Sequence, residues 1–294
     1  MNGCSILIGH VDTLNYLKFG VEQIRKYRHP EIPQEIIIVD QSPEAVFEEV
    51  HALYGKDDDI QLLRTAAVDL GYVIDMGLKH SRFDFCCTLD CDAFPIHRHW
   101  LYLPVQLLER YKIGFVGSNT GLEKSYQQKG QFFHLNNYYR VSRTALARQL
   151  SETVGFMRPG KRNAVGFQPQ DTSWGTDYAD VGVIAQWYAD QKQLGDKLSL
   201  KITSYIGKTN KMGVYGMVID DLVFHMVFGG KEEVNETFGP AFLQLRERML
   251  REGLSEPFIR ELIAGSVKAG SSRSLNGQPI DPEIDRFIEQ LKNS

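Results

Sequence analysis

The amino-acid sequence predicts an α/β fold in which a mostly parallel β-sheet is covered by helices on both faces. Short apolar runs recur along residues 1–119, and segments with helical spacing of apolar side chains separate them. Several of the runs end in an aspartate or a histidine. Alternation of strand and helix favours parallel strands, since each return crossing needs a connecting helix. Ligands of such sheets bind beyond the carboxyl ends of the strands.

The first strand is expected at residues 4–9, CSILIG, and it ends next to His10. Asp12 or Thr13 can cap the helix that follows. One face of this helix carries apolar residues at the 3.6-residue period, namely Leu14, Leu17, Val21 and Ile24. The second strand, QEIIIVDQS, is fully apolar at 36–39 and stops at Asp40, as a strand buried on both faces would.

The same reasoning predicts the remaining elements of this half at 44–54 (helix), 60–66 (strand), 69–82 (helix), 83–89 (strand) and 112–119 (strand). The strand at 83–89 delivers Asp90 and Asp92 at its carboxyl end. Beyond residue 120 the pattern loosens into glycine-rich and aromatic stretches, and residues 238–294 are mainly helical. His97 and His99 follow a Pro-Ile turn and are expected in a solvated loop.

Composition excludes several classes of protein. The chain has 294 residues, of which 43% are hydrophobic and 24% charged, as in a folded globular protein. A net charge of -4 provides no basic field for nucleic acid. No apolar stretch approaches the length of a transmembrane helix, and the N-terminus does not resemble a secretion signal. The four cysteines form no CxxC pair, which suits a reducing compartment, so we expect a cytoplasmic protein.

Asp90 and Asp92 are the strongest candidates for a functional site. Two ionised carboxylates about 4 Å apart repel by roughly 4 kcal/mol at an effective dielectric of about 20. No lysine or arginine lies in 83–97 to offset this repulsion, although a protonated acid or a divalent cation would. Mg²⁺ and Mn²⁺ favour oxygen ligands and commonly bridge carboxylates to phosphates. The alternative is a pair of solvated acids on a turn.

The stretch LDCDAFP resembles the DxD motif of the GT-A glycosyltransferases, especially family 2, in which this motif holds a metal and the diphosphate of a sugar nucleotide. SILIGH, with Gly9 and His10, is similar to the first strand of the family, which frames the nucleobase. IIIVDQS is similar to the second strand, so Asp40 is expected to contact uracil or ribose.

Three further motifs follow in the family's order. DLGYVIDMG resembles the NxGxxxARNxG motif through Asp69, Gly71, Asp75 and Gly77, with Ile74 in place of the arginine. WGTDYAD resembles the acceptor-site motif whose last acid is the general base, here Asp177, with Thr176 in place of the glutamate. DDLVFHMVFGG resembles the strand whose histidine completes the metal site, which indicates His225. The resemblance covers about residues 4–230.

The resemblance implies a GT-A fold and a metal-dependent transfer of a sugar, with inversion, from a nucleoside-diphosphate donor, most simply UDP-linked, to a carbohydrate or other hydroxyl acceptor. The cofactor would be Mn²⁺ or Mg²⁺, held by Asp90, Asp92 and His225. Trp174 and Tyr138 are candidates for stacking on the acceptor. The expected domains are 1–235, with a nucleotide-binding half at 1–119 and an acceptor half at 120–235, and a helical extension at 236–294 that is a candidate surface for a homodimer.

Other interpretations stay open at this point. A haloacid-dehalogenase-like phosphatase would use Asp90 as a nucleophile, and a non-catalytic sugar-binding protein would keep the fold without the reaction. Single residues also have structural alternatives. Asp177 can cap a helix that begins there, His225 can be a hydrogen-bonded core histidine, and Asp40 can end its strand in a turn.

Overall fold

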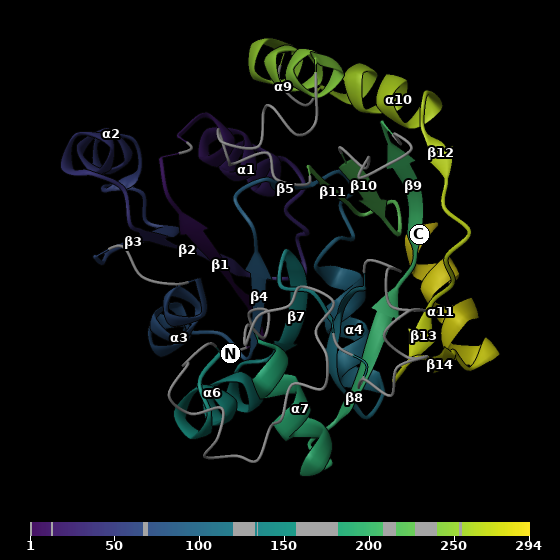
Figure 1. Ribbon diagram of the computed structural model, residues 1–294. Helices are drawn as coiled ribbons and strands as arrows, with labels where there is room; N and C mark the ends of the chain where they lie inside the picture. Colours follow the sequence, from purple (N-terminus) through teal and green to yellow (C-terminus); the bar gives the residue numbers. More distant parts are fainter. Residues whose placement is uncertain are drawn as a thin grey trace.

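The computed structural model describes residues 2–12, 14–66, 70–119, 133, 135–156, 182–207, 216–226, 240–252 and 255–294. Within these residues the strands form two sheets, one of nine strands and one of five (Figure 1). The nine-stranded sheet has the order β14-β13-β8-β6-β7-β4-β1-β2-β3. Helices lie on both of its faces, so the predicted α/β class is confirmed.

Four parallel strands form one half of the large sheet, namely β1 (Cys4–His10), β2 (Gln34–Asp40), β3 (Ile60–Arg64) and β4 (Phe85–Leu89). These strands coincide with the predicted apolar runs to within a few residues at each end. Every residue of β2 is buried, as its uninterrupted apolar pattern predicts. Because the strands are parallel, their carboxyl ends lie along the same edge of the sheet. His10 and Asp40 are paired in register at this edge.

The other half of the large sheet is mixed. β6 (Ile113–Ser118) and β8 (Asp196–Leu200) are parallel to each other, and β7 (Tyr139–Arg143) lies antiparallel between β4 and β6. β13 (Ser274–Leu275) and β14 (Gln278–Pro279) complete this side with antiparallel pairings. β7 therefore runs opposite to its neighbour β4. Its preceding residue Tyr138 lies next to the acidic pair, because the Asp90 N–H donates to the Tyr138 carbonyl at 3.1 Å.

Each face of the large sheet has its own apolar core, formed with its own set of helices. One face of the large sheet packs against α1 (Leu14–Lys26), α2 (Glu44–Tyr54), α4 (Tyr102–Arg110) and α11 (Pro282–Lys292). The other face packs against α3 (Leu70–His80), α6 (Thr144–Thr153) and α7 (Val183–Gln191). Burial of apolar side chains on both faces stabilises the arrangement at about 25 cal/mol per Å² removed from water.

The five-stranded sheet is antiparallel throughout, in the order β12-β9-β10-β11-β5. Its strands are β5 (Ala93–Pro95), β9 (Ile202–Ile206), β10 (Gly216–Ile219), β11 (Val223–His225) and β12 (Val267–Lys268). A third apolar cluster joins this sheet to α1, α9 (Pro240–Glu252) and α10 (Glu256–Ala264). Of these helices, α9 and α10 lie above the sheet at the top of Figure 1.

The C-terminal segment differs in one respect from the expected helical pattern. It contains α9, α10 and α11, but it also contributes β12 to the small sheet and β13 and β14 to the large one. These strands have two residues each, which is too short for a periodic pattern to reveal. The boundary at residue 235 stays a prediction.

The histidines after the Pro-Ile turn are not solvated as expected. His99 is 2% exposed, and its ring lies 5.3 Å from that of His29 and 5.1 Å from that of His97, measured between centroids. Tyr102 stacks on His29 at 4.2 Å. The sequence did not reveal this contact because His29 lies in a loop far from His99 along the chain.

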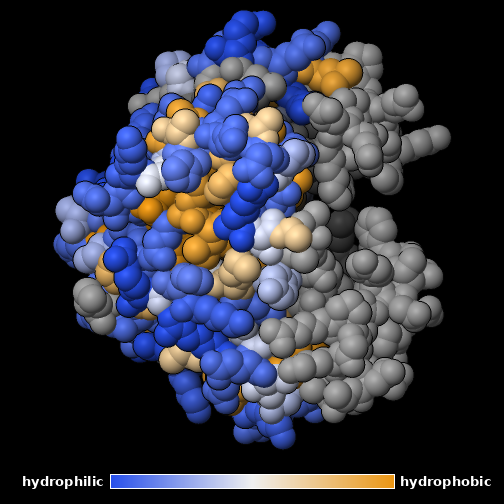
Figure 2. All heavy atoms as spheres, turned by 90° about the vertical axis from the view of Figure 1, so that its left-hand side faces the viewer, coloured by the Kyte–Doolittle hydropathy of each residue, from blue (hydrophilic) through white to orange (hydrophobic). Residues whose placement is uncertain are grey.

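Figure 2 faces the β3 edge of the large sheet and shows apolar side chains gathered in a largely polar surface. β3 contributes the half-buried Leu62 and Leu63 at this edge.

The expected homodimer stays a prediction. All four cysteines are free thiols, and three of them are buried. None of the helices in the described ranges has the length and apolarity needed to cross a membrane.

Candidate functional site

The acidic pair lies in the connection between the two sheets. β4 ends at Leu89, and Asp90 and Asp92 precede β5, which belongs to the small sheet. A bond from the Ala93 N–H to the Asp90 carbonyl, 3.0 Å, closes a tight turn over the pair. Asp92 is buried at 8% exposure, and Asp90 is half-buried. The sequence therefore places two carboxylates at a sheet edge, one of them buried and the other partly accessible to water.

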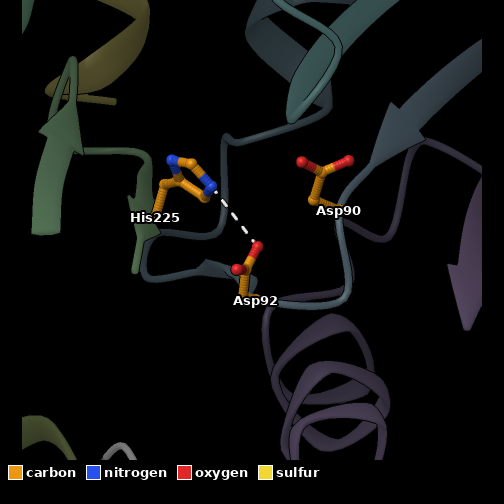
Figure 3. A group of neighbouring side chains, drawn as sticks. All are labelled: Asp90, Asp92 and His225. Atoms are coloured by element: carbon orange, nitrogen blue, oxygen red, sulfur yellow. Dashed lines mark ion pairs between the residues drawn. The ribbon is translucent and has the colours of Figure 1, made fainter. Parts of the chain in front are cut away.

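His225 reaches this turn through strand pairing. β11 pairs with β5 so that His225 lies opposite Ala93, and the Met226 N–H donates to the Asp92 carbonyl at 2.9 Å. As a result, His225 Nε2 lies 3.3 Å from Asp92 Oδ1 (Figure 3). The ring of Tyr138 stacks on that of His225 at 4.2 Å between centroids, with 8° between the planes. This stack fixes the orientation of the imidazole.

Asp90, Asp92 and His225 together form a cluster of suitable size for a metal ion. One ligand atom from each lies within 4.8 Å of the others. Ligands of Mg²⁺ or Mn²⁺ lie about 2.0–2.2 Å from the ion, so two of them are separated by at most about 4.4 Å. Small side-chain movements would close the difference. The buried His225 Nδ1 has no hydrogen-bond partner among the described residues, while Nε2 faces Asp92.

The ends of β1 and β2 form a second polar cluster that is fully buried. His10 Nδ1 contacts Asp40 Oδ2, and both residues are 0% exposed. The other oxygen of Asp40 accepts from the Ser42 N–H at 2.9 Å, and the Ser42 hydroxyl donates to Asp40 Oδ2 at 3.3 Å. With both oxygens engaged, Asp40 orients His10 and Ser42. Its predicted contact with the nucleotide stays a prediction.

Ser42 was not predicted as a site residue. The available signal was its position two residues after Asp40, where an aspartate commonly accepts a hydrogen bond from the backbone. The Ser42 hydroxyl also accepts from the Asp12 N–H at 3.0 Å. This bond ties the loop after β1 to the loop after β2.

Gly9 and Gly71 lie where α3 approaches β1. A Cβ atom on Gly9 would meet Leu70 Cδ1 at 2.8 Å and Val73 Cγ1 at 3.2 Å, so glycine permits the close packing of this helix. Gly71 is buried in the first turn of α3. A small cavity here is lined by Gly9, Leu70, Asp90 and Asn137 among others, so Gly9 and Asp90 border the same space. Their predicted contacts with the sugar nucleotide are untested.

Three predicted site residues, Asp69, Trp174 and Asp177, lie outside the described residues. The helix that was expected to begin at Asp177 begins at Val183, and Gly182 occupies its N-cap with a left-handed φ of 74°. Whether Asp177 caps a helix concerns residues outside the described ranges, so that structural alternative stays untested. A glycine suits position 182 because a side chain there would be strained and would meet Arg140.

The two sheets joined through an acidic turn define an α/β protein of the GT-A type. The sequence model described as Glycosyl transferase family 2 matches residues 5–166, more than half of the chain. The chain belongs to glycosyl transferase family 2. The fold expected from the resemblance is thereby confirmed. No curated protein sequence matches the chain significantly.

Similar solved structures include the mannosyltransferase PcManGT from Pyrobaculum calidifontis in complex with GDP-Man and Mn²⁺, at 17% identity over 52% of this chain and 47% of that chain, with a TM-score of 0.41. S. aureus TarS 1-349 is similar at 13% identity over 53% and 50%, with a TM-score of 0.41. A second S. aureus TarS structure gives 14% identity over 53% and 30%, with a TM-score of 0.42. The chain thus matches half or less of these proteins.

Proposed function

We propose that the protein is a metal-dependent glycosyltransferase that moves a sugar from a nucleoside-diphosphate donor, first of all a UDP-sugar, to a hydroxyl acceptor with inversion. The observation that carries the proposal is the convergence of Asp90, Asp92 and His225, whose ligand atoms lie within 4.8 Å of one another at the edge between two sheets. Membership of family 2 supports the class of reaction.

Asp90, Asp92 and His225 would hold the divalent cation. The cation would supply positive charge against the diphosphate as negative charge grows on the leaving group. An imidazole ligand beside two carboxylates favours Mn²⁺ over Mg²⁺, since Mg²⁺ prefers oxygen ligands alone. The low exposure of Asp92 strengthens its interaction with any cation bound there.

On the acceptor side, Asp177 would take the proton of the attacking hydroxyl, a contribution of about 10²- to 10⁴-fold in rate. Attack from the face opposite the leaving group gives inversion. Trp174 and Tyr138 would stack on the acceptor. One face of the Tyr138 ring is covered by His225, so a sugar could stack only on the other face, and the residue is 8% exposed.

The proposal is tested by calorimetric titration of UDP and GDP with and without Mn²⁺. Asp92→Ala should abolish the Mn²⁺-dependent binding, because it removes the buried member of the acidic pair. Asp177→Ala should keep donor binding and lose about 10²- to 10⁴-fold in transfer. Asp58→Ala is the matched control, since Asp58 is exposed on the loop before β3. Full transferase activity in both site variants would disprove the assignment.

Two alternatives remain to be distinguished. Family membership favours a transferase over a haloacid-dehalogenase-like phosphatase, and phosphoryl labelling of Asp90 would reverse that preference. A non-catalytic sugar-binding protein would bind the sugar nucleotide without consuming it. Slow, Mn²⁺-dependent hydrolysis of a sugar nucleotide in the absence of acceptor separates an enzyme from such a protein.

A further inference from the structure

We infer that Arg246, in helix α9 of the C-terminal segment, binds the diphosphate of the donor, so that the C-terminal segment completes the donor site. The inference rests on the proposed function and adds to it a residue outside the stretch matched by the family, 5–166. Three observations support the inference: the packing of α9, the contact of Arg246 with Tyr16, and the negative charge of the diphosphate that the site must neutralise.

α9 is anchored next to the acidic turn by apolar packing. Met249 of α9 is fully buried in the cluster that contains Phe94 and Met226. Phe94 follows Asp92 by two residues in β5, and Met226 follows His225 directly. The strands that carry the candidate metal ligands and the helix that carries Arg246 therefore share one core. Figure 1 shows α9 above α1, β5 and β11.

Arg246 contacts Tyr16 of α1, and Tyr16 packs against the residues that follow the candidate metal ligands. The Arg246 Nε–H donates to the Tyr16 hydroxyl at 3.2 Å, and the guanidinium carbon lies 6.0 Å from the centre of the ring. The Tyr16 hydroxyl in turn donates to Met226 Sδ at 3.7 Å, and the ring stacks on Phe94 at 6.2 Å between centroids. The buried phenol thus connects the guanidinium to the residues that follow Asp92 and His225.

The charges of Arg246 and Asp92 both act on the hydroxyl of Tyr16. Burial raises the pKa of Tyr16 to about 12, while the charge of Arg246 acts to lower this pKa and the charge of Asp92 acts to raise it. The same phenol therefore lies in the field of the cation and of the carboxylate. This agrees with the packing, which places Arg246 and Asp92 on segments that share one core.

A nucleoside diphosphate brings several negative charges to a turn that already carries Asp90 and Asp92. A divalent cation neutralises only part of this charge, and the departing diphosphate gains one more negative charge. A guanidinium matches phosphate oxygens with paired N–H donors and keeps its charge when partly buried. Such a charge-assisted contact stabilises the leaving group more than the intact donor.

The neighbouring arginines of α9 have a different function. Arg248 donates through both terminal nitrogens to Glu261 and through Nε to Glu252 at 3.0 Å. Arg251 pairs with Glu252 at 2.9 Å and is 71% exposed. These ion pairs join α9 to α10 and to itself on the outer surface. Arg246 donates to a phenol in the shared core.

The test is calorimetric binding of UDP and GDP in the presence of saturating Mn²⁺ to the wild-type chain, Arg246→Met, Arg246→Lys and Tyr16→Phe. Arg246→Met should weaken diphosphate binding by about 10- to 100-fold, the loss typical of a charge-assisted hydrogen bond. Arg246→Lys keeps the charge and should lose less. Tyr16→Phe keeps the ring but removes the acceptor that orients Arg246, and it should lose several-fold.

Arg251→Met is the control, because it removes a charge from the same helix on the exposed side. It should bind UDP and GDP as the wild type does. Mn²⁺ binding without nucleotide should be equal in wild type and Arg246→Met, which also shows that the variant is folded. Equal diphosphate affinities of wild type, Arg246→Met and Tyr16→Phe would overturn this inference alone. A wild-type chain that binds neither diphosphate would overturn the proposed function and this inference with it.

Discussion

Replacing Arg273 by methionine tests how the C-terminal segment supports the site. Arg273 is 2% exposed in its side chain, and its Nε and one terminal nitrogen donate to the two oxygens of Asp220, which is fully buried. The other terminal nitrogen donates to Asp285 at 2.5 Å. Asp220 lies in the turn between β10 and β11 with a left-handed φ of 50°. This turn leads directly into the strand that carries His225.

Arg273→Met leaves the buried carboxylate of Asp220 with Lys292 Nζ at 2.9 Å as its remaining ion-pair partner among the described residues. Loss of one partner from a buried pair costs about 3–5 kcal/mol, because the remaining charge stays desolvated. Lys292 offsets part of this cost, so we expect a loss of about 3 kcal/mol in the free energy of unfolding. Affinity for Mn²⁺ should fall as well, since the loosened turn no longer holds β11 against β5.

Arg25→Met is the matched control. Arg25 also contacts two acids, Asp57 at 2.6 Å and Asp59 at 2.7 Å, but its side chain is 40% exposed. Exposed ion pairs contribute about 0–1 kcal/mol each, because water and salt screen them. Urea unfolding of both variants measures the difference. Equal costs below about 1 kcal/mol would refute the reasoning, as would a variant Asp220→Asn/Arg273→Met that is no more stable than Arg273→Met alone.

Two further predictions concern the site and the histidine cluster. Tyr138→Leu should weaken Mn²⁺ binding several-fold, measured by titration without nucleotide, because the ring that stacks on His225 is lost; unchanged affinity would contradict it. Burial lowers the pKa of His29, His97 and His99 below 6.5. The charge of Arg98 lowers each pKa further, and Glu31 opposes the shift for His29 and His99, so the unfolded chain binds more protons below pH 6.5. Urea unfolding should therefore show stability falling as pH drops through about 6.5, by at most about 1.4 kcal/mol per pH unit per histidine, and His99→Gln should reduce this slope.

Part of the site was predictable because its signals are local. Apolar periodicity determines where a strand or helix forms, and a parallel α/β sheet brings the ends of successive strands to one edge. The positions of His10, Asp40 and the acidic pair at strand ends were predicted in this way. The predicted ligand His225 depended on a family resemblance, since nothing in its own neighbourhood along the chain relates it to Asp92.

By itself, then, the sequence determined the α/β class, the positions of the first strands and helices, and the presence of two acids at a strand end. Only the tertiary structure decided that β11 pairs with β5, that Tyr138 stacks on His225, and that Arg246 contacts Tyr16. These are contacts between segments far apart along the chain. They depend on which apolar surfaces pack together, and no period within either segment records that choice.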